Sequence, residues 1–109
     1  MDSLQEAFGK LILEFQNIFG NALEQIILYG SAARGTDTEE SDVDIAVIVR
    51  KYTEEMHDKM IDFIVDLELE YNKVFSVLLI DYDNFKEWEN VLPFYQNVKK
   101  DGVMLWSVA

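Results

Sequence analysis

Apolar and polar positions along the chain follow two kinds of pattern, which predict long helices and short strands in alternation. Residues 3–19 carry an apolar side chain at about every third or fourth position, and the pattern stops at Gly20, as expected of a helix that packs one face on a core. A second stripe of this kind follows Thr53, which is a suitable N-cap, and continues to about residue 71. The sequence therefore predicts two amphipathic helices.

Shorter apolar runs between and after these helices predict strands. They are QIILY at 25–29, VDIAVIV at 43–49, VFSVLLI at 74–80 and the brief VMLW at 103–106. Except for Asp44, the second run is apolar at odd and even positions alike, a pattern typical of a central strand that is covered on both faces. We expect this run to lie inside a sheet.

The segment between the last two runs predicts helix. Residues 81–84 (DYDN) combine turn formers with N-caps, and helical character then continues to Pro93. This proline either interrupts the helix or opens a new one that ends near Gly102. The resulting order predicts an α+β fold, in which a small mixed sheet is covered by helices.

Length and composition favour one domain over residues 1–109, because 109 residues at 50% hydrophobic content suit a single core. No apolar run is long enough to cross a bilayer, and the N-terminus lacks the pattern of a secretory signal, so we expect no membrane partner and a cytoplasmic location. The absence of cysteine excludes disulfides, thiolate metal sites and a cysteine nucleophile.

The formal charge of -12 disfavours binding to bulk nucleic acid, because the average surface field repels a polyanion. A single nucleotide is a different case. Its phosphates respond mainly to nearby cations and dipoles, which act more strongly than the distant surface charge.

The stretch GSAARGTDTEESDVDIAV, residues 30–47, holds the candidate chemistry. In a strand, Asp42 and Asp44 would project from one face about 6.5 Å apart along the chain, a spacing that lets two carboxylates bracket Mg²⁺ or Mn²⁺. Alone, this pair is more often an acidic turn. Gly30 and Ser31 strengthen the case, because glycine permits an unusual backbone turn and the serine and following amides can bind phosphate oxygens.

These residues resemble the minimal nucleotidyltransferases (MNT) of the DNA polymerase beta-like superfamily. The family pattern G-S-x-x-R-G followed by S-D-x-D is matched here by residues 30–35 and 41–44. The resemblance implies a polymerase beta-like fold and transfer of a nucleoside monophosphate, chiefly AMP from ATP, to a hydroxyl acceptor. It also implies that Asp42 and Asp44 are catalytic metal ligands.

The resemblance further implies that Gly30 and Ser31 hold the outer phosphates of the nucleotide. Arg34 would neutralise triphosphate charge, although a salt bridge to one of the nearby acids is an equally good interpretation. Two metal ions can stabilise the attacking and leaving oxygens of such a displacement, so little other covalent chemistry is required of the protein.

One departure from the family concerns the third carboxylate expected on the next strand. In our alignment its position falls on Ser76. Asp81 is the alternative, but strand parity puts it on the opposite face and turn formation explains it, unless a bulge shifts the register. Loss of the third ligand would weaken activation of the acceptor hydroxyl more than binding of ATP.

Two other residues receive structural interpretations. His57, the only histidine, lacks a partner in a nucleophile motif and is expected on the surface. Tyr29 comes just before Gly30 and could stack near a nucleotide, but an aromatic side chain at the end of an apolar strand is more often part of the core.

Two functions compete. The first is an enzyme that transfers AMP, in the manner of MNT antitoxins that act on an all-helical HEPN partner. The second is a binding module with weak or no catalysis that neutralises its partner by forming a complex, as Ser76 suggests. Antibiotic modification by a related fold ranks low because it needs a second domain. A homo-oligomer is compatible with either function.

Overall fold

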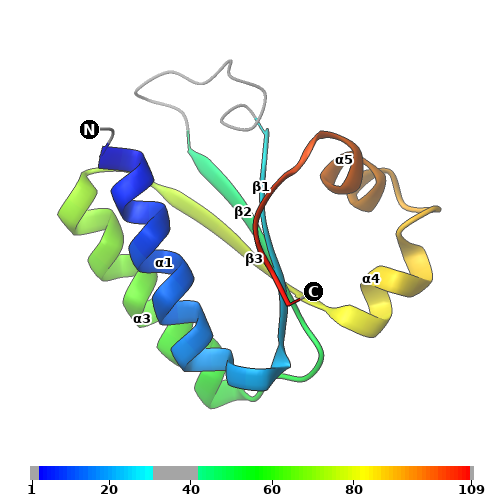
Figure 1. Cartoon of the computed structure of the whole chain (residues 1–109), viewed down its shortest axis with the longest axis horizontal. Coiled ribbons are helices and arrows are strands. Elements are labelled where there is room, and N and C mark those ends of the chain that lie inside the picture. Colours follow the sequence, from blue (N-terminus) through cyan, green and yellow to red (C-terminus); the bar gives the residue numbers. More distant parts are fainter. Residues whose placement is uncertain (1–2, 31–41, 109) are drawn as a thin grey trace.

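The computed structural model describes residues 3–30 and 42–108 and forms a sheet with helices on both faces (Figure 1). Its elements are α1 (Ser3–Phe19), the 3₁₀ turn η1 (Gly20–Ala22), β1 (Leu23–Tyr29), β2 (Val43–Val49), α3 (Glu54–Tyr71), β3 (Phe75–Asp81), α4 (Tyr82–Trp88), α5 (Pro93–Asp101) and β4 (Val103–Ser107). The predicted α+β class is confirmed.

The four strands form one mixed sheet in the order β3-β2-β1-β4. Strand β1 is antiparallel to both of its neighbours, whereas β2 and β3 run parallel through the crossover helix α3. The predicted central strand is confirmed, because β2 lies between two partners and all of its residues except Asp44 are buried. Alternate residues of β2 therefore face two separate cores.

The larger core lies between the sheet and the helices α1 and α3, which lie side by side on one face (Figure 1). Phe15 is fully buried there, and its ring lies edge-on to that of Phe63 with 6.1 Å between centroids. The two helices are also joined at their surface, where the Tyr71 hydroxyl donates to Glu6 Oε1 over 2.9 Å. The stripe predicted for the second helix packs into this core.

The smaller core lies on the opposite face, beneath α4 and α5 (Figure 1). Ala46 and Ile48 of β2 meet Phe85 of α4 and Val98 of α5 there. These two helices are short, at 7 and 9 residues. They cover only part of the sheet, so Ser76 and Leu78 of β3 stay exposed on this face.

Helix boundaries follow local chemistry, with one correction. Thr53 caps α3 by accepting from the backbone N–H of Met56 over 3.1 Å, as predicted, and Pro93 occupies the first turn of α5. The expected helix up to Pro93 is too long, because α4 already ends at Trp88. The backbone N–H groups of Val91 and Leu92 both return to the Trp88 carbonyl, which closes the chain into a turn.

No helix within residues 3–30 or 42–108 is long and apolar enough to cross a membrane.

Replacing Thr53 tests the cap of the crossover helix. Thr53→Ala removes the acceptor for the Met56 N–H, and we expect it to lower the free energy of unfolding by about 1 kcal/mol, whereas Thr53→Ser keeps the acceptor and most of the stability. Urea denaturation followed by circular dichroism measures both. Equal losses in the two variants would show that the hydroxyl does not stabilise the helix.

Candidate active site

The candidate site begins at the N-terminal end of β2. Asp42 directly precedes the strand and is exposed, while Asp44 is its second residue and is half-buried. Side chains alternate along a strand, so Asp44 shares a face with Ala46 and Ile48, which belong to the smaller core. The carboxylate of Asp44 thus lies on the α4–α5 face of the sheet.

Gly30 lies directly beside this carboxylate. Tyr29, the last residue of β1, pairs with Asp44 across the antiparallel ladder, and the chain then turns at Gly30 with φ of +75°. A Cβ atom at Gly30 would overlap the carboxylate of Asp44. Glycine is therefore required here both for its backbone conformation and for the space it leaves.

Tyr29 connects this corner with α5. Its ring lies edge-on to Phe94, with 5.6 Å between centroids and an interplanar angle of 86°. Burial raises the pKa of the Tyr29 hydroxyl, and the negative charge of Asp44 raises it further. The sequence assigned Tyr29 to the core, and its ring does pack against the smaller core, but the side chain also borders the candidate site.

A cavity of about 210 Å³ opens next to this tyrosine. It is lined by Tyr29, Gly30, Phe94, Asn97, Val98 and Asp101. The contribution of α5 to this corner was missed by the sequence reasoning, since pairing of Tyr29 with Phe94 joins residues 65 positions apart and leaves no local pattern.

Strand β3 brings Ser76 to the site. Ser76 is in parallel register with Asp44, so the two side chains lie next to each other on the same face, and Ser76 is exposed. The alignment of Ser76 with the expected third carboxylate thus agrees with the strand pairing. Ser76 therefore has a hydroxyl at the position where the family would have its third metal-binding carboxylate.

Asp81 lies elsewhere. It pairs with Val49 at the far end of β2, five residues and roughly 16 Å along the strand from Asp44. Its carboxylate caps α4 by accepting from the Asn84 N–H over 3.1 Å. The β2–β3 register runs without a bulge from Val43 to Val49, so no shift brings Asp81 back. The turn interpretation of Asp81 fits this geometry.

The remaining predicted site residues divide into two groups. Ser31 and Arg34 lie outside the described residues. His57 is on the surface as predicted, with Nδ1 3.7 Å from Asp58 Oδ1 and nearly half of its side chain exposed. It lies on α3, which covers the opposite face of the sheet from Asp44.

The donor set of this corner fits a hard divalent cation. Asp42 and Asp44 offer carboxylate oxygens, and Mg²⁺ commonly binds through one or two carboxylates together with substrate phosphates. Within residues 3–30 and 42–108, no group of three or more acidic, histidine or cysteine side chains gathers as a metal site. The described ligands therefore suit a site in which the substrate supplies the missing oxygens.

Comparison with known proteins identifies the family to which this chain belongs. The family model described as polymerase beta, nucleotidyltransferase, matches residues 10–108. A relative from Methanocaldococcus jannaschii that is named as a protein adenylyltransferase is 34% identical over 101 residues, which are 89% of this chain and 96% of that protein. The chain belongs to the polymerase beta nucleotidyltransferase family, as its motif predicted.

Solved structures share the fold. A toxin–antitoxin structure with AMP-PNP matches with a TM-score of 0.58 and 23% identity, over 90% of this chain and 72% of that chain. A complex of the tri-AMPylated Shewanella oneidensis HEPN toxin with its MNT antitoxin matches with a TM-score of 0.54 and 21% identity, over 94% and 71% of the two chains. The predicted nucleotidyltransferase fold is thereby confirmed.

A pair of glycine variants tests the contact between Gly30 and Asp44. Gly30→Ala places a Cβ on the carboxylate, so we expect it to weaken ATP binding in the presence of Mg²⁺ by about tenfold, since even small displacements of a ligand misplace the metal. Isothermal titration calorimetry measures the affinity.

Gly20→Ala is the matched control. Gly20 also has a positive φ, of +53°, but a Cβ there meets nothing within 4 Å. Both variants carry the same kind of backbone strain, of about 1 to 2 kcal/mol, and only Gly30→Ala is expected to lose affinity. Equal affinities of the two variants for ATP would show that Gly30 is not part of the site.

Proposed function

We propose that this protein transfers AMP from ATP to a hydroxyl group of a partner protein, and that the partner is an all-helical protein of the HEPN type. The observation that carries the proposal is the meeting of Asp44 and Gly30 at one corner of the sheet. The relative at 34% identity is named as a protein adenylyltransferase, which supports the same reaction.

The proposed reaction exchanges a phosphoanhydride bond of ATP for a phosphodiester bond to the acceptor. The acceptor oxygen attacks the α-phosphorus of ATP and forms a new O–P bond, while the bond from this phosphorus to the β-bridging oxygen breaks and pyrophosphate leaves. The proton of the acceptor hydroxyl passes to solvent. Bound Mg²⁺ would neutralise the charge that develops on the phosphate oxygens.

The residues of this chain position the reactants. Asp42 and Asp44 would hold the metal, and the absence of a side chain at Gly30 lets the Asp44 carboxylate lie directly against this turn. Ser31 and Arg34 follow this turn in sequence and are proposed to bind the outer phosphates. The ring of Tyr29 forms an apolar wall between the metal ligands and α5.

Net charge and a structural relative favour a protein as the acceptor. A chain of formal charge -12 disfavours a polyanionic acceptor such as bulk nucleic acid. Solved relatives by fold include an MNT antitoxin bound to an AMPylated HEPN toxin, which supports a protein acceptor of this class. We further propose that the protein acts in the cytoplasm as the antitoxin of such a pair.

Label transfer tests the reaction. The protein is incubated with Mg²⁺ and the HEPN-type protein encoded beside it, with ATP labelled at either the α- or the γ-phosphate. We expect label on the partner only from α-labelled ATP, and a loss of about a hundredfold or more for Asp42→Asn with Asp44→Asn. Asp62→Asn, on the exposed face of α3, is the matched control and should keep full transfer. Absence of transfer by the unaltered protein with Mg²⁺ or Mn²⁺ would contradict the proposal.

A second function is favoured by one observation, the hydroxyl of Ser76 in register with Asp44. A protein without a third carboxylate that neutralises its partner only by binding would need no metal. In that case the Asp42→Asn, Asp44→Asn double variant would protect cells from the partner as well as the unaltered protein does. Loss of protection in parallel with loss of label transfer instead supports the enzyme.

Restoring an acid at Ser76 tests the geometry of the metal site. Ser76→Asp places a carboxylate beside Asp44, and we expect the Mn²⁺ concentration for half-maximal label transfer to fall by about tenfold. Ser76→Asn has nearly the same size without the charge and should not lower it. If the two variants behave alike, Ser76 does not face the metal.

A further inference from the structure

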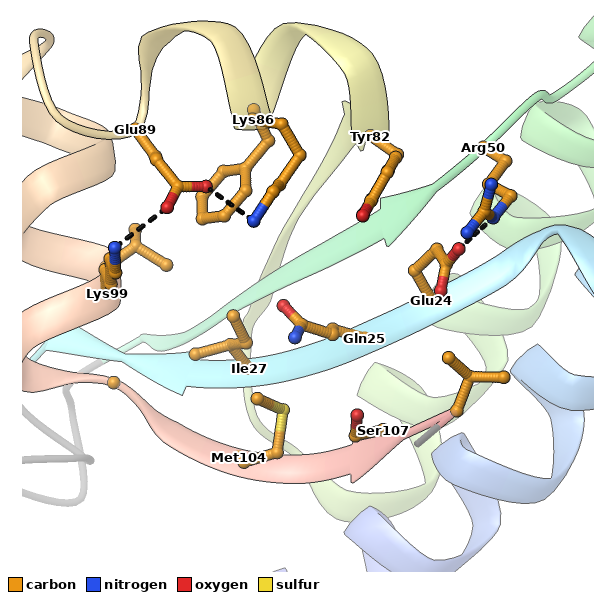
Figure 2. Close-up of a pocket in the computed structure, with 14 residues that line it drawn as sticks. Glu24, Gln25, Ile27, Arg50, Tyr82, Lys86, Glu89, Lys99, Met104 and Ser107 are labelled. Atoms are coloured by element: carbon orange, nitrogen blue, oxygen red, sulfur yellow. Dashed lines mark hydrogen bonds and ion pairs between the residues drawn. The ribbon is translucent and has the colours of Figure 1, made fainter.

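A second cavity lies on the α4–α5 face of the sheet, at the opposite end of the strands from Asp44. It has a volume of about 510 Å³ and is bounded by β1, β4, α4 and α5 (Figure 2). Its lining includes Glu24 near the start of β1 and Arg50 just after the end of β2, but neither Gly30 nor Asp44. Cavities of this size hold small organic ligands.

The floor of this cavity is apolar. Ile27, Phe85 and Val98 are buried and come from three different elements, and the half-exposed Met104 of β4 continues the surface toward the opening. Burial of an apolar ligand group on such a floor is favourable, because it removes apolar surface from water. The floor therefore suits a flat or aliphatic body.

One rim carries two lysines that share a single carboxylate. Glu89 is buried, Lys99 Nζ donates to its Oε1 over 2.8 Å, and Lys86 Nζ lies 3.5 Å from its Oε2. Figure 2 shows the two lysines on either side of this carboxylate. The hydrogen bond from Lys99 lowers the pKa of the Glu89 carboxyl, and the positive charges of both lysines act in the same direction. Glu89 thus stays ionised at neutral pH and fixes both ammonium groups at the rim.

These ammonium groups retain donors for a ligand. Each lysine ammonium has three N–H donors. Lys99 uses one of them in its hydrogen bond to Glu89 Oε1, whereas Lys86 contacts Oε2 as an ion pair without a hydrogen bond. The side chains of Lys86 and Lys99 are 55% and 54% exposed, so the ammonium groups are open to solvent and to a bound molecule.

The lining of the cavity carries more positive than negative side chains, which favours an anionic ligand. Three cations, Arg50, Lys86 and Lys99, line the cavity together with two carboxylates, Glu24 and Glu89, which leaves one positive charge in excess. Arg50 is already bonded to Glu24 and lies over the ring of Tyr82 at 4.8 Å. In a chain of formal charge -12 this local excess is unusual, and a ligand with one negative charge neutralises it.

We propose that this cavity is a binding site for a small amphipathic organic monoanion. The anionic group accepts hydrogen bonds from Lys86 and Lys99, and the apolar body lies on the floor formed by Ile27, Phe85 and Val98. The lining shares only Val98 with the cavity beside Tyr29, and the site does not depend on the function proposed for the Asp44 corner.

Two matched probes test this site. Anilinonaphthalene sulfonate is an aromatic monoanion, and N-phenylnaphthylamine has the same rings without the charge. In fluorescence titrations we expect saturable one-to-one binding of the sulfonate that is about tenfold tighter than binding of the neutral amine. In NMR spectra of the labelled protein, the largest amide shifts on adding the sulfonate should fall at residues 25–27, 85–86 and 98–99.

The variant Lys86→Gln removes one cation and leaves Glu89 hydrogen-bonded to Lys99. We expect it to reduce sulfonate affinity by about fivefold to tenfold and to leave the affinity for the neutral amine unchanged. Lys59→Gln is the control, because Lys59 is an exposed lysine of α3 that pairs only with Glu55 among its described contacts. Circular dichroism verifies that both variants are folded.

Three results would overturn the proposal. They are equal affinity for the charged and neutral probes, equal effects of Lys86→Gln and Lys59→Gln, and amide shifts centred outside the cavity, as adsorption to exposed apolar surface would give.

Discussion

The pairing of β2 with a strand on each side is the constraint on which the rest of this structure depends. Every residue of β2 except Asp44 is buried, and its two faces meet different cores. A slip of one residue would exchange the faces and drive Asp44 toward the core beneath α1 and α3. The burial of β2 therefore fixes its register, and the register in turn fixes the neighbours of Asp44.

Those neighbours define what the corner can do. The antiparallel ladder sets Tyr29 opposite Asp44, and the parallel ladder sets Ser76 on its other side. The carboxylate is half-buried, and desolvation of a charge is unfavourable unless a cation or donor compensates it. A bound divalent cation would compensate this charge, and the carboxylate reaches its position only because residue 30 has no Cβ to overlap it.

Local signals in the sequence were enough to predict most elements. Apolar residues at both odd and even positions identified β2, and the Thr53 hydroxyl marked the start of α3. A helix that begins at Pro93 was one of the two alternatives left open at that residue, and α5 does begin there. Each of these signals acts within a few residues of the structure that it specifies. The end of α4 was mispredicted, because no glycine or proline in the sequence marks the turn at Trp88.

Contacts between residues far apart in the sequence were harder to predict. The motif placed Asp44 and Gly30 together because the family pattern fixes their spacing. In contrast, neither the contact of Tyr29 with Phe94 nor the hydrogen bond of Lys99 to Glu89 follows a sequence periodicity that would predict it. Such contacts arise when strands and helices pack, so they depend on the strand order β3-β2-β1-β4 and on the position of α5 above it.

The unequal cover of the two sheet faces explains why both candidate sites lie on the same side. Helices α1 and α3 span 17 and 18 residues and bury their face in one continuous core, whereas α4 and α5 span 7 and 9. The short helices protect Ala46, Ile48 and Ile80 at the centre of the second face and leave its ends uncovered. One end exposes Ser76 beside Asp44, and the other opens into the cavity rimmed by lysines. An uncovered end can admit an acceptor carried on the surface of another protein, which an enclosed pocket would exclude.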